Sequence, residues 1–150
     1  MPGPTFHNYP GIGAKNSEAF HYSQAVKVGN IVKCSGQGGW DAEGTIERDP
    51  ELQIRQAMEN VEKALRTVDG RLGWENVYAV KSYHVDMEGT FDMMTTEFKR
   101  LSPTLRPVWT CVEVGKLGIP GLLVEVEVEA WIENRDRKST RLNSSHRLYL

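Results

Sequence analysis

Cysteine is scarce in this sequence of 150 residues, and the scarcity argues against two kinds of protein. The two cysteines, Cys34 and Cys111, are too few for a disulfide framework, and they lack the paired spacing of a zinc site. Free thiols persist in reducing compartments. The sequence therefore predicts a cytoplasmic protein without a bound metal, and the mitochondrion is the alternative location.

Long hydrophobic runs and an excess of basic charge are also missing. No apolar stretch approaches the roughly 20 residues of a membrane-spanning helix. The first residues, Met1 to Pro4, do not resemble an export signal. The 18 basic and 20 acidic residues leave a net charge of −2, which provides no positive field for nucleic acid phosphates. We expect one soluble domain that binds neither membranes nor nucleic acid.

The end of the chain differs in composition from the rest. From Asp136 to His146 the sequence DRKSTRLNSSH is polar, basic and aperiodic, and it resembles the in-frame translation of a sequencing-library adapter. A natural polar tail is the alternative interpretation, and either kind of segment is left out of fold reasoning. Without residues 136–150 the net charge becomes 14 − 19 = −5. We expect a single domain over residues 1–135, with an irregular N-terminal arm over residues 1–20, and a natural C-terminus that is missing.

A regular succession of strand and helix patterns fills the domain. Two short apolar runs, 25–28 and 31–35, flank Gly29-Asn30, which is a hairpin signal. Asp49 and Pro50 suit the N-cap and first position of a helix. The further expected elements are a helix over 54–68, a strand over 76–86, a helix over 90–101, and strands over 108–114 and 122–132. The order is ββαβαββ.

The last strand alternates in polarity, which assigns its two faces. One side carries residues that two helices can cover: Leu122, Val124, Val126, Val128 and Ala130. The other side carries a mixed set: Leu123, Glu125, Glu127, Glu129 and Trp131. Two helices leave that second face bare, and such a face is often a subunit interface. The pattern predicts an α/β (α+β) domain, one sheet with two helices on one face, that forms an oligomer.

The single motifs are weak when each is taken alone. Gly36, Gly38 and Gly39 do not match a phosphate-binding loop and favour a tight turn. His84 lacks the paired spacing of a metal site and is expected to be half-buried or exposed on its strand. Cys111 is expected to be a small buried strand residue, and a nucleophile is the alternative. The alternating glutamates form a solvated face, or supply an acid or base if a second subunit covers them.

Four segments together are more specific than their parts. In order and spacing they resemble the RidA/YjgF family of reactive-intermediate deaminases, formerly described as L-PSP endoribonucleases: YSQAVKVGN (22–30), CSGQ (34–37), CVEV (111–114) and VEVE (124–127). The resemblance extends over roughly residues 20–132. It implies a chorismate-mutase-like fold, a homotrimer, and ligand sites in clefts between subunits. It also implies hydrolysis of enamines and imines, such as 2-aminoacrylate and 2-iminobutanoate, to 2-keto acids and ammonia without a cofactor.

The resemblance also implies roles for individual residues. Tyr22 matches the tyrosine that lines the cleft, and Ser35 and Gly36 match the strand end that borders it. Glu125 matches the glutamate that positions the attacking water, with one extra residue in the preceding loop. Glu127 is the alternative if the alignment shifts by two residues.

Two positions near the end of the cleft depart from the family pattern. Trp109 stands where active members carry the arginine that clamps the substrate carboxylate, and an indole offers one N–H and no charge. Arg106 is the nearest cation, on the opposite strand parity. Thr95 stands near a position where active members usually carry an asparagine. Thr110 and Cys111 match positions whose backbone groups hold the ligand.

Three functions compete on this pattern. The first is hydrolysis of an imine or enamine, with Glu125 as the acid–base group and water as the nucleophile. The second is a non-catalytic trimer that binds a small aromatic or apolar metabolite between Trp109 and Tyr22, and that regulates or protects. A ribonuclease is the weakest interpretation, because an acidic domain with no basic patch and no catalytic histidine pair does not suit RNA.

Overall fold

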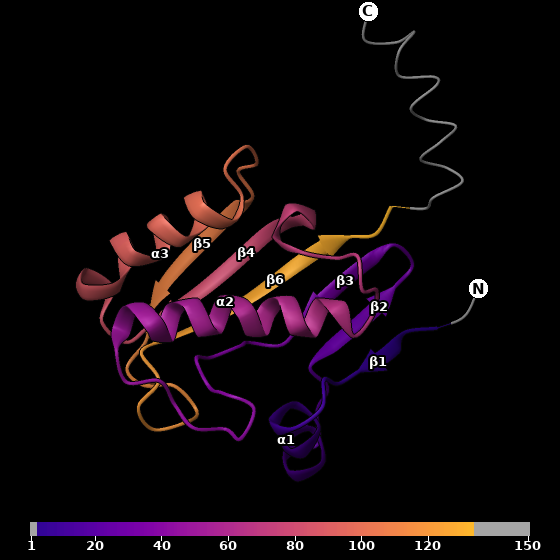
Figure 1. Cartoon of the computed structure of the whole chain (residues 1–150), viewed down its shortest axis with the longest axis horizontal. Coiled ribbons are helices and arrows are strands. Elements are labelled where there is room, and N and C mark those ends of the chain that lie inside the picture. The colour runs from indigo at the N-terminus through magenta and orange to yellow at the C-terminus, as the bar shows by residue number, and fades with distance from the viewer. Residues whose placement is uncertain (1–2, 134–150) are drawn as a thin grey trace, which may run out of the picture.

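The computed structural model describes residues 3–133, which form a mixed α+β structure around one sheet (Figure 1). Its elements in chain order are β1 (Thr5–His7), α1 (Ile12–Phe20), β2 (Ala25–Val28), β3 (Ile31–Cys34), α2 (Pro50–Arg66), a short 3₁₀ helix (Trp74–Asn76), β4 (Val77–His84), α3 (Met87–Leu101), β5 (Val108–Glu113) and β6 (Val124–Trp131). The tail over residues 136–150 lies outside the described residues. No helix in the described part is long and apolar enough to cross a membrane.

The six strands form one sheet in the order β1-β2-β3-β6-β4-β5. Strands β4 and β5 are parallel, and all other neighbours are antiparallel. Helices α2 and α3 cover one face of the sheet, and the last strand, β6, lies inside it between β3 and β4 (Figure 1). From β2 onward the predicted order ββαβαββ and the two helices on one face are confirmed.

The β2–β3 hairpin forms where the sequence predicts it. Val28 pairs with Ile31, so Gly29 and Asn30 are the two turn residues. Gly29 has a φ of +59°, whereas Asn30 is not among the residues with positive φ. A positive φ at the first turn residue alone is the pattern of a type II′ turn, whose twist matches the flanking strands.

Helix α2 supplies much of the core. Asp49 caps it by accepting a hydrogen bond from the Leu52 N–H at 3.0 Å, and Pro50 is its first residue. The buried face of α2 consists of Ile54, Ala57, Met58, Val61, Ala64 and Leu65, and it packs with the helix-facing side chains of β6. Full burial of each large apolar side chain contributes roughly 1.5–3 kcal/mol. The predicted alternation of β6 is confirmed, because Val124, Val126, Val128 and Ala130 are buried.

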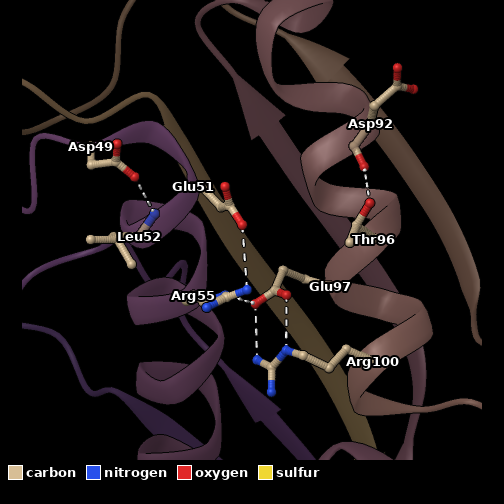
Figure 2. A network of polar contacts seen from close by, with 8 residues as sticks. All are labelled: Asp49, Glu51, Leu52, Arg55, Asp92, Thr96, Glu97 and Arg100. Carbon is tan, nitrogen blue, oxygen red and sulfur yellow. Dashed lines mark hydrogen bonds and ion pairs between the residues drawn. The ribbon is translucent and has the colours of Figure 1, made fainter.

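A charged cluster joins α2 to α3 over the sheet (Figure 2). The Glu97 side chain is 3% exposed, and its carboxylate binds Arg100 of its own helix at 2.9 Å and Arg55 of α2 at 3.3 Å. Glu51 adds a contact to Arg55 at 3.4 Å. The cluster satisfies a carboxylate that would otherwise be buried without a partner.

The prediction of an irregular arm over residues 1–20 is wrong. Strand β1 pairs with β2, and α1 follows it. Helix α1 carries no strong local signal, because Gly11 precedes it with a φ of +76° and no side chain caps it. Contacts distant in sequence hold it instead, including a hydrogen bond from the Ile12 N–H to the Ala42 carbonyl at 3.0 Å.

Two strand residues differ in burial from the sequence prediction. His84 is fully buried rather than half-buried or exposed, because Ser82 and Thr90 give both ring nitrogens a hydrogen-bonding partner. Cys111 is partly exposed rather than buried, because β5 is the edge strand of the sheet.

Candidate functional site

The first group of predicted site residues meets at the ends of β3 and β6. Tyr22, Ser35, Gly36 and Glu125 line one cavity of 330 Å³. Glu125 points to the face of the sheet that α2 and α3 leave uncovered, since its neighbours Val124 and Val126 are buried beneath the helices. We call this cavity the Glu125 pocket.

Gly36 permits the close approach of Glu125. A Cβ atom at position 36 would overlap the Glu125 Oε1 atom and lie 2.8 Å from its Cδ atom. The glycine is therefore a steric requirement of the pocket rather than part of a phosphate loop.

The carboxyl of Glu125 is electrostatically unusual. Burial raises its pKa above the ordinary value, and the charge of the neighbouring Glu127 raises it further. Within residues 3–133, the Glu125 carboxyl makes no hydrogen bond or ion pair. Glu127 differs, because the Tyr83 hydroxyl donates to one of its carboxyl oxygens. Of the two glutamates proposed from the sequence, Glu125 is the one whose carboxyl has no hydrogen-bonding partner among the described residues.

Tyr22 and Ser35 are held by a network of buried amides. The Gln24 Nε2 donates to the Tyr22 hydroxyl at 2.9 Å, and the Gln37 Nε2 donates to the Gln24 Oε1 at 2.8 Å. The Ser35 hydroxyl donates to the Ser23 carbonyl at 2.6 Å. The Tyr22 hydroxyl thus accepts from the protein, and its own proton has no partner within the described residues. The Tyr22 hydroxyl can therefore donate a hydrogen bond to a ligand.

The second group lies at the opposite edge of the sheet, on the helix-covered face. Thr95 and Trp109 line a cavity of 390 Å³ between α3 and β5. The Trp109 ring stacks on Phe91 with centroids 5.1 Å apart and meets Phe98 edge-on at 4.9 Å. We call this cavity the β5 pocket.

A chain of hydrogen bonds fixes Trp109 from behind. The Trp109 Nε1–H donates to the Ser82 Oγ at 2.8 Å, and Ser82 contacts the His84 Nε2 at 2.8 Å. The Thr90 hydroxyl donates to the Asp86 carbonyl, so it accepts from the His84 Nδ1–H at 2.7 Å. Burial lowers the pKa of His84, which keeps the ring neutral with its proton on Nδ1. Every donor and acceptor in this series of hydrogen bonds therefore has a partner, and the indole N–H is not available to a ligand.

Thr110 and Cys111 point in opposite directions. The Cys111 Sγ lies 3.3 Å from the Met87 Sδ on α3. Thr110 lines a small cavity of 70 Å³ on the uncovered face together with Glu127 and Lys81. Sequence alternation predicts this arrangement for β5, and it leaves only their backbone groups for a common ligand.

Within a single chain, the Glu125 pocket and the β5 pocket are separate. Glu125 and Trp109 lie on opposite faces of the sheet, and β4 separates their strands. The two cavities share no lining residue. Within residues 3–133, no cluster of side chains suited to a metal ion is present.

Sequence reasoning missed the residues behind the site. Ser82 and His84 orient Trp109, and Lys99 and Ser102 line the β5 pocket. For Ser82 and His84, the available signal was their position as alternate polar residues on a strand that is otherwise apolar on that face. Nothing local marked the second pair, Lys99 in the last turn of α3 and Ser102 at its C-cap.

Comparisons with known proteins identify the family of this chain. A family model described as Endoribonuclease L-PSP matches residues 14–132. The RutC family protein YjgH of Escherichia coli (strain K12) is 33% identical over 112 residues, which cover 74% of this chain and 82% of the relative. A solved structure of protein YjgH, 27% identical, matches with a TM-score of 0.76 over 89% of this chain and 99% of the other.

A structure from Mycobacterium tuberculosis, described as a member of the YjgF/YER057c/UK114 family, is 28% identical. It matches with a TM-score of 0.71 over 87% of this chain and 100% of the other. The chain therefore belongs to the endoribonuclease L-PSP family, which is the RidA/YjgF family.

Proposed function

We propose that this protein hydrolyses small imines or enamines of the 2-iminobutanoate or 2-aminoacrylate type, with Glu125 as the acid–base group. The observation that supports this most is the environment of Glu125: a partly buried carboxyl with a raised pKa, in a pocket, without a hydrogen-bonding partner within residues 3–133. Such a carboxyl takes up a proton at higher pH than an exposed one, which suits proton transfer.

The chemistry requires water and no cofactor. Glu125 accepts a proton from water as the water oxygen bonds to the imine carbon; the π electrons move to the nitrogen, and Glu125 passes the proton on to it. In the second step Glu125 takes the proton of the carbinolamine hydroxyl and gives it to the amino nitrogen, the C–N bond breaks with its electron pair going to nitrogen, and ammonia leaves. The carbonyl product remains. An enamine enters the same sequence after it takes up a proton on carbon.

We also propose that the working unit is a homotrimer, with ligand clefts between subunits. Two features support an oligomer: the Glu125 and β5 pockets do not meet within one chain, and the uncovered face exposes large apolar side chains. Two of these are Val108, 70% exposed, and Phe6, 66% exposed. Light scattering should give the mass of three chains, and a monomer at micromolar concentration would overturn this assembly.

Ammonia release from freshly generated 2-iminobutanoate tests the reaction. Glu125→Gln keeps the shape of the side chain and removes its proton transfer, so the rate should fall about 100-fold or more. Glu129→Gln makes the same change on the same strand, outside the Glu125 pocket, and should keep the wild-type rate. Equal rates for the wild type and Glu125→Gln would remove the enzymatic proposal for this substrate.

A non-catalytic binding protein is the second candidate, and Trp109 favours it. The indole is packed between two phenylalanines with its N–H bound to Ser82, so position 109 offers no charge to a substrate carboxylate. The ligand would then be a small aromatic or apolar metabolite held between Trp109 of one subunit and Tyr22 of another.

Trp109→Arg separates these candidates. If a missing carboxylate anchor alone limits hydrolysis, the new guanidinium should raise kcat/KM about ten- to hundredfold. If Trp109 serves as packing, the same change buries a charge without a partner and lowers the melting temperature or the oligomer mass. An intact trimer that gains no activity would show that position 109 alone does not block the reaction.

We also propose that the protein resides in the cytoplasm, because its thiols are not joined in a disulfide. Cys34 and Cys111 are both free, and burial raises the pKa of Cys34 to about 12. Free thiols suit the reducing cytoplasm.

A further inference from the structure

The β5 pocket has the size and lining of a ligand site within a single chain. Its lining residues include the end of α3, the following turn and the start of β5, and its volume of 390 Å³ falls in the usual range for small-molecule pockets. Figure 1 shows the turn that joins these two elements. Its walls are largely apolar, with Trp109, Phe98 and Leu105 among them. Leu105 is 46% exposed, so an apolar ligand would remove it from water.

The charges around this pocket are of one sign. Lys99 and Arg106 line it, and no acidic side chain does. Within residues 3–133, neither cation makes a hydrogen bond or an ion pair. Arg100, next to Lys99 in sequence, shows the contrast, since it makes two hydrogen bonds to the Glu97 carboxylate. Two unpaired cations at an apolar cavity attract an anion with an apolar body.

Ser102 provides a third, independent observation. It lines the same pocket, and its Oγ is buried without a hydrogen-bonding partner among residues 3–133. Buried polar atoms nearly always have a partner, and an orphaned hydroxyl destabilises the fold. A ligand oxygen at this wall would supply the missing partner.

We propose that the β5 pocket binds an amphipathic monocarboxylate, with its apolar ring or branched chain against Trp109 and its carboxylate beside Arg106 and Lys99. The indole acts as a wall, because its N–H is bound to Ser82. The two cations that would bind the carboxylate come from α3 (Lys99) and from the turn between α3 and β5 (Arg106). The proposal concerns binding and does not depend on hydrolysis at Glu125.

Calorimetric titration of the whole protein with phenylacetate tests the proposal. The controls divide the probe into its parts: 2-phenylethanol keeps the ring without the charge, and acetate keeps the charge without the ring. Phenylacetate should bind at millimolar concentration or below, and each control at least tenfold more weakly. No binding of phenylacetate, or equal affinity for 2-phenylethanol, would overturn the proposal.

Variants locate the carboxylate. Arg106→Gln and Lys99→Gln should each weaken phenylacetate binding about tenfold, as expected for loss of a bond to a charged group. Lys63→Gln removes the same charge from an exposed position on α2 and should change nothing. If Lys63→Gln weakens binding as much as the other two, the effect is one of net charge and the proposed site is wrong.

Two further variants separate this site from its surroundings. Ser102→Ala should raise the melting temperature, because it removes an orphaned hydroxyl, and should weaken phenylacetate binding. Unchanged affinity in that variant would remove Ser102 from the site. Glu125→Gln should bind phenylacetate as the wild type does while it loses ammonia release, so failure of the hydrolase proposal is distinguishable from failure of this one.

Discussion

The Glu125 pocket and the β5 pocket hold their residues by different means. Behind the first, buried amides and hydroxyls bond to one another, so that Tyr22 and Ser35 are fixed by polar contacts. In the second, Trp109 is fixed mainly by ring packing, with one chain of hydrogen bonds behind it. A polar network demands that every partner be present, whereas ring packing accepts small changes of shape.

The two pockets also differ in charge. The first carries a carboxyl and no cation, and the second carries two cations and no carboxyl. Such a division keeps Glu125 from an ion pair that would lower its pKa. It also leaves Arg106 and Lys99 available for an anion. If both proposals hold, proton transfer and anion recognition belong to separate parts of this chain.

The largest expected effect comes from breaking the polar network at Gln37. Gln37→Leu leaves the proton of the Tyr9 hydroxyl without its acceptor and the Gln24 Oε1 without its donor, bonds of 2.7 and 2.8 Å in the wild type. Since each orphaned buried group costs about 1–3 kcal/mol, unfolding in urea should show a loss of about 3 kcal/mol. Lys63→Leu, at an exposed position of α2 whose side chain makes no hydrogen bond or ion pair within the described residues, is the control and should cost less than about 1 kcal/mol. Equal losses would contradict the importance of the network.

A smaller effect is expected at the aromatic pocket. Ser82→Ala removes one acceptor and one donor, from Trp109 and His84 respectively, and should cost about 2 kcal/mol. Ser17→Ala, which breaks no side-chain hydrogen bond within the described residues, should stay within about 0.5 kcal/mol of the wild type. A loss at Ser82 larger than the loss at Gln37 would reverse the contrast drawn between the two pockets.

The smallest effect is a pH dependence. Because the pKa of Glu125 is raised in the folded protein, the folded chain holds a proton that the unfolded chain has released. Stability therefore falls as pH rises from the ordinary carboxyl value of 4.5 through the raised value. Glu125→Gln removes this dependence, so its melting temperature relative to the wild type should increase between pH 4 and pH 7. A constant difference over that range would contradict the raised pKa.

The sequence predicted the elements whose signals are local. The Gly29-Asn30 turn, the Asp49 cap and the alternation of β6 each follow from a few neighbouring residues, and each is confirmed. Helix α1 was missed because distant contacts, such as the Ile12 bond to Ala42, hold it. His84 was misjudged because its burial depends on the hydroxyls of Ser82 and Thr90.

The candidate site was predictable only in part. Resemblance to a family grouped Tyr22, Ser35, Gly36 and Glu125, which line one cavity. Strand parity placed Trp109 and Cys111 on one face, as observed from their contacts with α3. The cavity beside Trp109 was beyond sequence reasoning, because a turn of irregular backbone decides which side chains face it.

The position of β6 has a consequence for synthesis of the chain. Among the strands of residues 3–133, the one synthesised last, β6, belongs in the middle of the sheet, between β3 and β4. A nascent chain that has not reached Val124 can form β1-β2-β3 and β4-β5 as separate pieces, each with an unpaired edge. Open edges of this kind favour wrong pairing and aggregation. We expect newly made chains to need protection until residue 131 has emerged, and then to complete the sheet in one cooperative step.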